Sequence, residues 1–156
     1  LVENNIDSIF YVVGGFENYI KHWKEKIQNN NVFFYGFVSQ QNIQKYLNSF
    51  DILLLPNQKN VYIVNTKNNI GEFTSPLKMF EYMATKKPII ASDLPVLKEV
   101  LNEDNSVLVK CNDISEWEKA IEILRDDSLR LQIANKAYED FIKEYSWKQR
   151  AENVIK

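Results

Sequence analysis

The sequence predicts a parallel α/β fold, in which helices cover both faces of a sheet. Three observations lead to this prediction. Short runs of β-branched and aromatic residues alternate with longer amphipathic segments along the chain. The run at Ile52–Leu55 is apolar throughout, which is typical of a strand covered on both faces. Strands that are joined by helices of this length form right-handed crossovers, which make a parallel sheet.

Three strands and two helices are predicted in the first part of the chain. The strands are Ser8–Val13, Val32–Tyr35 and Ile52–Leu55. Between the first two strands, apolar residues recur at helical spacing and predict a helix that follows the Gly14-Gly15 turn. Ser39 is a suitable N-cap for the second helix, because its hydroxyl can accept a hydrogen bond from a free helix amide.

The alternation continues after a long polar segment at residues 57–74. Such long segments are uncommon in compact domains unless they are functional or disordered. The elements expected next are a helix from Pro76 to about Thr85, a strand at Pro88–Ala91, a short helix at Pro95–Leu101 and a fifth strand at Val107–Val109.

The tail is predicted to be helical. Asp113 and Glu116 have the spacing of a capping box, in which each side chain bonds the amide of the other residue. Asp126-Asp127-Ser128 interrupts the pattern, and Ser146 is placed to cap a last helix. The helix between them carries Leu131, Ala134, Tyr138, Phe141 and Ile142. The tryptophans expected to pack in the core or against helices are Trp23, Trp117 and Trp147.

Size and composition favour one domain over residues 1–156 and exclude several classes of function. A chain of 156 residues with 45% hydrophobic residues can build one core. A net charge of −2 leaves no basic excess for binding nucleic acid. Cys111 is the only cysteine, which excludes an intrachain disulfide and fits a reducing, cytoplasmic compartment. His22 is the only histidine, so no zinc site built on histidine and cysteine is expected.

The ends and the hydropathy of the chain lead to two further expectations. No apolar run approaches the ~18 residues that suggest a membrane span, and the chain does not open on a signal peptide. It opens with Leu1 rather than methionine, which indicates a piece of a longer chain.

Candidate ligand-binding residues follow from the predicted topology. Ligands of a parallel sheet bind at the carboxyl ends of the strands, where helix N-termini also point. The loops expected there are Gly14–Glu17, Gly36–Ser39 and the segment from Pro56 to Pro76. Gly14-Gly15 also fits a plain tight turn, since it is not a dinucleotide-binding fingerprint.

The third loop ends in the sharpest pattern. Ser75 is at the N-cap position and Pro76 at the first helical position. The free amides of Leu77 and Lys78, with the positive end of the helix dipole behind them, suit a diphosphate. Glu81, about one turn further, can accept hydrogen bonds from two adjacent hydroxyls, as on a ribose. Lys78 and Glu81 could instead form a surface ion pair worth about 0.2–0.5 kcal/mol, and spacing alone leaves both interpretations open.

The run TSPLKMFEYMATKKPIIAS at residues 74–92 resembles the signature of the family 4 type of retaining glycosyltransferases, which have the two-domain GT-B fold. The similarity extends over most of the chain. It includes YVVGG, NVFFYGFVS, FDILLLP, Glu99 and SWKQRAENVI. Their order and spacing are similar to those of the family's C-terminal, donor-binding domain, which is Rossmann-like. The resemblance therefore implies the donor half of a two-domain enzyme, without the first strand of that half.

The resemblance also implies roles for individual residues. The helix start at Ser75-Pro76-Leu77 would hold the phosphates of the donor through backbone amides, and Lys78 would share the phosphate charge. Glu81 matches the second acidic residue of the family's paired-glutamate motif and would bind the donor ribose. Gly15 is counted with the donor-binding residues, and Phe37 and Val38 would line the nucleobase site, largely through the backbone.

The sequence departs from the family pattern in two ways. The family's first glutamate lies eight residues before the second, where this chain has Phe73. Glu72, one residue further away, is the candidate for contacting the transferred sugar. The family's opening strand, its Arg- and Lys-bearing loop and its acceptor-binding N-terminal domain have no counterpart before Ser8, so we expect this chain alone to be nearly inactive.

The full-length enzyme implied by the resemblance passes a sugar from a nucleotide diphosphate sugar to an acceptor hydroxyl. It retains the anomeric configuration and needs no metal or other cofactor. It is expected to be cytoplasmic, with association at the inner membrane face as a further option. One rival is a non-catalytic nucleotide-binding or interaction module, favoured by Phe73 at the first glutamate position; another is a dehydrogenase domain, for which no fingerprint exists. The sugar, the base, the acceptor and the oligomeric state are not specified by the sequence.

Overall fold

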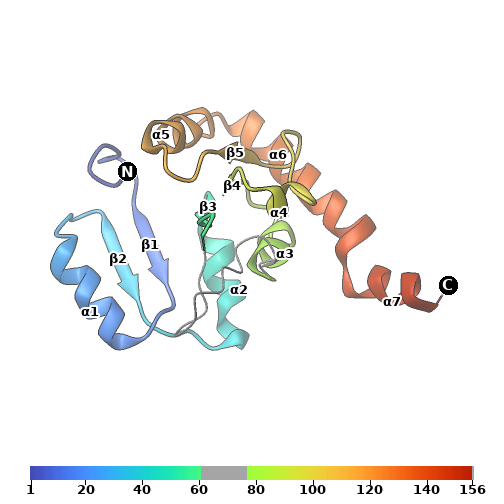
Figure 1. Cartoon of the computed structure of the whole chain (residues 1–156), viewed down its shortest axis with the longest axis horizontal. Coiled ribbons are helices and arrows are strands. Elements are labelled where there is room, and N and C mark those ends of the chain that lie inside the picture. The colour runs from blue at the N-terminus through green and yellow to red at the C-terminus, as the bar shows by residue number, and fades with distance from the viewer. Residues whose placement is uncertain (61–76, 156) are drawn as a thin grey trace. The chain divides into compact units, whose positions relative to one another are not determined.

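The computed structural model describes residues 1–60 and 77–155, and it divides the chain into two compact units, Leu1–Tyr46 and Leu47–Lys156. The strands are parallel in both units, and helices connect them (Figure 1). The predicted parallel α/β class is therefore confirmed. Helix α2, Gln40–Ser49, passes from the first unit to the second.

The first unit contains a two-stranded sheet. Its strands β1, Phe10–Val13, and β2, Val32–Tyr35, pair in register from Phe10 opposite Val32 to Val13 opposite Tyr35. Helix α1, Glu17–Lys26, connects them. β1 begins two residues later than predicted. The backbone carbonyl of Ser8 instead accepts a 3.1 Å hydrogen bond from the Nδ2 atom of Asn31.

Aromatic side chains stabilise one face of this sheet. Tyr11 stacks on Phe33, with ring centroids 5.6 Å apart, and Tyr35 meets Tyr46 of α2 edge-on at 5.8 Å. On α1, by contrast, the predicted buried position Trp23 is 47% exposed. The periodicity identified the apolar face of α1 correctly, but only part of that face is covered by the sheet.

The second unit contains a three-stranded parallel sheet in the order β3-β4-β5. These strands are Leu53–Leu55, Ile89–Ser92 and Val107–Val109. The helices are α3, Leu77–Met83; α4, Pro95–Lys98; α5, Ile114–Ile123; α6, Asp127–Asp140; and α7, Trp147–Ile155. A π-helical turn, η1, occupies Phe141–Tyr145 between α6 and α7.

The core of the second unit lies on one face of this sheet. Ile89 and Ala91 of β4 are fully buried in a cluster with residues of α3, α4 and α6. Ile90 lies between them and points the opposite way, because side chains alternate along a strand. Helix α5 contacts β4 and β5, and buries Trp117, Ala120 and Ile121. Helices therefore cover both faces, as predicted.

The tail differs from the prediction in three details. Asp113 caps α5 by accepting a hydrogen bond from the Glu116 amide, but the Glu116 carboxylate bonds the Lys110 amide at 2.7 Å and so completes no capping box. Helix α6 ends at Asp140, so Phe141 and Ile142, which the sequence placed on this helix, belong to η1; the buried side chains of α6 are Ile133, Ala134 and Ala137. Trp147 is 78% exposed rather than buried in the core.

Candidate functional site

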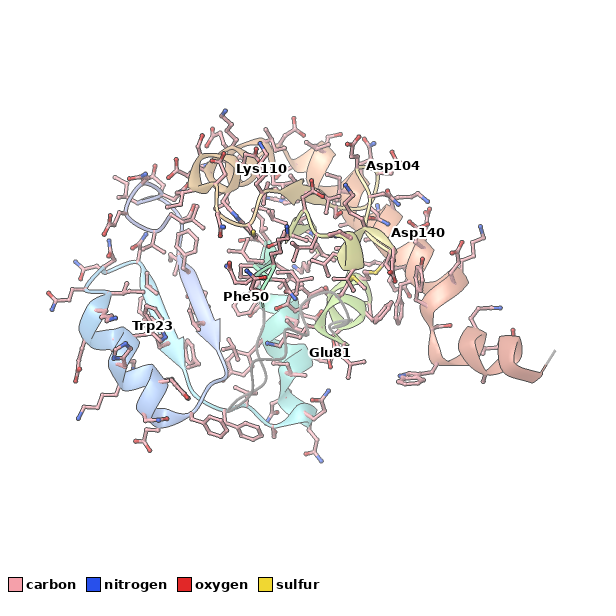
Figure 2. All side chains as sticks on the ribbon, viewed as in Figure 1. Trp23, Phe50, Glu81, Asp104, Lys110 and Asp140 are labelled. Carbon is pink, nitrogen blue, oxygen red and sulfur yellow. The ribbon has the colours of Figure 1, made fainter. Side chains whose placement is uncertain are left out.

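Helix α3 carries three of the predicted donor-binding residues on one face. Met79 and Met83, one turn apart, are fully buried and anchor the helix to the core. Leu77, Lys78 and Glu81 lie on the opposite face at helical spacing. Figure 2 labels Glu81 on this helix. Leu77 is 68% exposed, Lys78 is exposed and Glu81 is half-buried. A backbone amide, an ammonium group and a carboxylate thus lie on the same face of one short helix.

The start of α3 lies at the carboxyl edge of the second unit's sheet. Because β3 and β4 are parallel and α3 connects them, α3 runs opposite to the strands. Its first turn therefore lies at the edge where ligands of such sheets bind. The predicted residues Glu72, Ser75 and Pro76 fall outside the described residues.

Two ion pairs at this edge were missed by the sequence reasoning. Lys98 pairs with Asp93 at 3.0 Å, and Lys110 pairs with Glu116 at 2.8 Å. The side-chain hydrogen bond from Lys110 lowers the pKa of Glu116, and the same hydrogen bond raises the pKa of Lys110. Their only signal in the sequence is the proximity of opposite charges in short loops. These two ammonium groups are compensated by carboxylates.

Lys78 differs from those two lysines. Within the part of the chain that the structure describes, no carboxylate forms an ion pair with Lys78. The surface ion pair with Glu81, which the spacing left open, is therefore absent from this structure. Lys78 is the one basic residue of α3, so its ammonium group supplies the positive charge on the exposed face of this helix.

In the first unit, the Gly14-Gly15 segment follows β1. Both glycines have positive φ, 107° and 93°, which explains why glycine is needed there. The Gly14 amide donates to the backbone carbonyls of Tyr35 and Gly36, each at 3.1 Å. These two contacts of the Gly14 amide join the ends of β1 and β2. The structure shows no hydrogen-bonded turn at these two glycines, which lie in the described loop between β1 and α1, so the plain tight turn that the sequence allowed is not observed there.

The predicted donor-binding residues of the first unit are Gly15, Phe37 and Val38. Gly15 lines an open, mainly apolar pocket of about 330 Å³ between α1 and the sheet. Phe37 and Val38 follow β2 and are not among the residues that line this pocket. The Phe37 ring is 86% exposed, and Val38 is half-buried.

The described residues include no constellation for metal binding. In those ranges, histidine, cysteine, aspartate and glutamate side chains form no group of three or more that could hold an ion. His22 packs edge-on against Trp23, with ring centroids 5.6 Å apart. Cys111 is half-buried as a free thiol. Among the described helices, none combines the length and apolar character that crossing a membrane requires.

Comparison with known proteins identifies both a sequence family and a fold. The family described as "Glycosyl transferase-like" matches residues 2–156. No curated protein sequence matches the chain significantly.

Three solved structures illustrate the similarity in fold. A variant of TarM from S. aureus, in complex with Fondaparinux, alpha-GlcNAc-glycerol and UDP, has a TM-score of 0.72 and 22% identity over 99% of this chain and 29% of its own. HepE from Anabaena, in complex with UDP-glucose, has a TM-score of 0.70 and 19% identity, over 94% of this chain and 40% of the HepE chain. The C-terminal domain of LpcC, a glycosyl transferase group 1 protein from Francisella tularensis, has a TM-score of 0.61 and 21% identity over 84% and 64%.

These identities support a shared fold. The fold is the Rossmann-like domain of GT-B proteins, and the resemblance to a C-terminal domain is consistent with the LpcC match. The chain spans less than half the length of TarM and HepE.

Proposed function

This chain belongs to the glycosyl transferase-like family, and we propose that it is the donor-binding domain of a retaining, family 4 type glycosyltransferase. The full-length enzyme would move a sugar from a nucleotide diphosphate sugar to an acceptor hydroxyl in the synthesis of a glycan or polysaccharide. The proposal extends the family assignment to a role for this chain and to a stereochemical outcome.

The observation that carries the proposal is the exposed face of α3. Lys78 and Glu81 lie side by side there, at the start of a helix that begins at the carboxyl edge of a parallel sheet. Lys78 can attract a diphosphate, and the Glu81 carboxylate can accept from the two hydroxyls of a ribose. A nucleoside diphosphate presents both groups a short distance apart. UDP and UDP-glucose in the TarM and HepE structures are ligands of that class.

In this proposal the chain stabilises the leaving group. As the bond from the sugar to the diphosphate breaks, negative charge builds on the diphosphate. Amides at the start of α3 and the Lys78 ammonium would interact more strongly with that charge than with the intact donor, which lowers the barrier. No metal is required in this scheme, because the protein supplies the positive potential.

The remaining roles are proposals of the same kind. Ser75 and Pro76 would place the first amides of α3, and Glu72 would contact the transferred sugar. Gly15, Phe37 and Val38 would belong to the nucleobase end of the donor. The acceptor would be bound by an N-terminal domain of the full-length protein, which we propose to be cytoplasmic or peripheral at the inner membrane face.

A nucleotide titration tests the proposal. We expect the chain to bind one of UDP, GDP and ADP in preference to the others, with amide shifts in residues 77–83. Glu81→Ala should weaken that nucleotide by about tenfold or more, because a hydrogen bond to a charged group contributes about 1.5–3 kcal/mol. Glu139→Ala, which removes an exposed carboxylate from α6, is the matched control and should leave the affinity unchanged.

Two results would count against the proposal. Equal affinities of wild type and Glu81→Ala would remove Glu81 from the site. Sugar transfer by this chain alone would contradict its assignment as half of an active site. The rival non-catalytic module makes a different prediction: a longer chain with the acceptor domain would bind nucleotide yet transfer no sugar.

A further inference from the structure

Helix α3 is too short to set its own orientation. It has seven residues, and isolated helices shorter than about 12–15 residues are marginal in water. Met79 and Met83 hold its buried face, but both lie opposite the exposed face that carries Lys78 and Glu81. Phe80 and Tyr82, on the two sides of the helix, also pack against the core cluster, so the rotation of the exposed face depends on these side contacts together with the methionines.

The side of α3 is packed by an aromatic pair. The rings of Phe80 and Tyr145 lie 5.5 Å apart between centroids and are tilted by 41°. Phe80 directly precedes Glu81 in the chain, and both Phe80 and Tyr145 are half-buried against the core cluster. A tilted pair at this distance is favourable beyond the area that it buries. Displacing the Tyr145 ring would thus leave Phe80, and with it α3, less constrained.

Tyr145 is presented by the π-helical turn η1. Such turns are rare, and they often occur at functional sites. Because the wider turn closes five residues apart rather than four, it changes which side chains face the core. In η1 both Phe141 and Tyr145 pack against the core cluster, and the helical path resumes only at Trp147.

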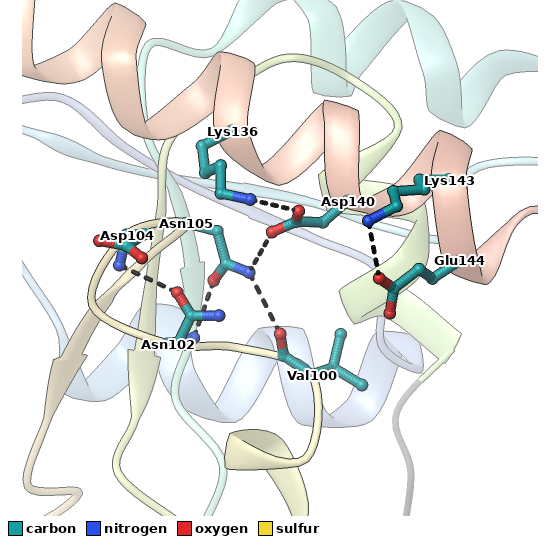
Figure 3. Close-up of polar contacts among 8 residues, drawn as sticks. All are labelled: Val100, Asn102, Asp104, Asn105, Lys136, Asp140, Lys143 and Glu144. Atoms are coloured by element: carbon teal, nitrogen blue, oxygen red, sulfur yellow. Dashed lines mark hydrogen bonds and ion pairs between the residues drawn. The ribbon is translucent and has the colours of Figure 1, made fainter.

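A polar network around the buried Asn105 side chain includes Asp140, the residue directly before η1 (Figure 3). Asp140, the last residue of α6, accepts a 3.0 Å hydrogen bond from Asn105 Nδ2 and a 2.6 Å hydrogen bond from Lys136 Nζ. Asn105 is fully buried; it also donates to the Val100 carbonyl at 3.1 Å and accepts from the Asn102 amide at 2.8 Å. The end of α6 is thereby attached to the loop that precedes β5.

We propose that Tyr145 is a positioning residue for the donor site: held by η1 and by the Asn105–Asp140 contact, its ring fixes the rotation of α3 and hence the placement of Lys78 and Glu81. The proposal rests on the function proposed above. It adds a residue that touches no ligand and acts through Phe80. A ring that only filled space in the core would affect stability without any effect on the exposed face of α3.

The test uses the chain's two methionines, Met79 and Met83, as reporters. Because both lie on the buried face of α3, selective methyl labelling yields two signals that report on this helix without any nucleotide. Tyr145→Leu removes the ring, and Tyr145→Phe keeps it while deleting the hydroxyl. Ile133→Ala, which removes a buried side chain of α6 that is not part of the α3 cluster, controls for stability loss alone.

We expect Tyr145→Leu to shift the methyl signals of Met79 and Met83 and the amide signals of Lys78 and Glu81. The spectrum of Tyr145→Phe should stay close to that of wild type. Ile133→Ala should shift neither the methyl signals nor these amide signals. For whichever of UDP, GDP and ADP the wild type binds best, Tyr145→Leu should weaken binding roughly tenfold, which corresponds to about 1.4 kcal/mol of lost interaction with the displaced Lys78 and Glu81. Tyr145→Phe should stay within about twofold, because it retains the ring contact.

The inference would be overturned if the methyl and amide signals of α3 were the same in Tyr145→Leu as in wild type. It would also be overturned if those signals shifted while the affinity for the nucleotide stayed unchanged. An equal loss of affinity in Ile133→Ala would also overturn it, because the effect would then follow stability. If wild type bound none of the three nucleotides, the proposed function would fail, and the methyl and amide signals would still decide whether Tyr145 positions α3.

Discussion

Replacing Asn105 by alanine should be among the most damaging single substitutions in the second unit. The side chain is fully buried and makes three hydrogen bonds, two to backbone groups and one to the Asp140 carboxylate. A neutral hydrogen bond contributes about 1 kcal/mol and one to a charged group about 1.5–3 kcal/mol, so we expect a loss of about 3–5 kcal/mol in the free energy of unfolding. The total free energy of unfolding of a typical domain is about 5–15 kcal/mol.

Urea denaturation followed through the methyl signals of Met79 and Met83 measures this loss. Both methyl groups lie in the core of the second unit, so they report its unfolding separately from that of the first unit. Asn135→Ala on the exposed side of α6 is the control, and helix propensity predicts a gain of at most about 0.7 kcal/mol for it. A loss below about 1 kcal/mol in Asn105→Ala would refute the view that this network holds the end of α6, since a single neutral hydrogen bond is worth that much.

Three further outcomes can be checked on the same unit. Burial alone would raise the pKa of Asp140, but hydrogen bonds from Lys136 and Asn105 outweigh it and hold the pKa below the ordinary value of 3.8. The ionised Asp140 carboxylate therefore stabilises the folded state fully above pH 3.8, and this stabilisation is lost as the pH falls through the lower pKa of the folded protein. The difference in unfolding free energy between wild type and Asp140→Asn should accordingly shrink in urea titrations at acid pH. Met83→Ala should cost about 2–5 kcal/mol in urea denaturation, because a fully buried side chain leaves a cavity. Asp126→Ala should cost about 0.5–2 kcal/mol in the same assay, because the N-cap bond to the Leu129 amide is lost.

The strands were the most predictable part of the fold. Val32–Tyr35 and Val107–Val109 have the predicted bounds, because a run of β-branched and aromatic residues specifies an extended chain locally. The exposure of side chains on the helices was less predictable. Periodicity shows which face of a helix is apolar, but not whether another element covers it. Trp23 and Trp147 are exposed for that reason, whereas Trp117 is buried with its Nε1 atom bonded to the Lys110 carbonyl.

Side-chain partners across the fold lay beyond the sequence pattern. Glu116 has the spacing of a capping box, yet its carboxylate turns to Lys110, because a charged partner in the preceding loop competes with the weaker amide interaction. The hydrogen bond from Asn105 to Asp140, the residue before the π-helical turn, joins two residues that are 35 positions apart and meet only in the folded chain. No local propensity encodes such a contact.

The candidate site was predictable to the extent that helical geometry determines it. The i, i+3 spacing of Lys78 and Glu81 placed them on one face of a helix, and the structure agrees. The spacing did not indicate that the opposite face would be buried through Met79 and Met83 or that Phe80 would contact Tyr145. Those contacts depend on elements that come much later in the chain.

This division of α3 into a buried and an exposed face separates stability from binding. The packing of α3 comes from Met79, Met83 and the contact of Phe80 with Tyr145, whereas the charged groups proposed to meet the donor contribute little to the core. Lys78→Ala is therefore expected to weaken nucleotide binding while leaving the urea midpoint nearly unchanged, because exposed substitutions usually stay within about 0.5 kcal/mol. A Lys78→Ala variant that lost stability and affinity together would show that the two faces are energetically coupled, and the site would then be part of the core rather than a surface supported by it.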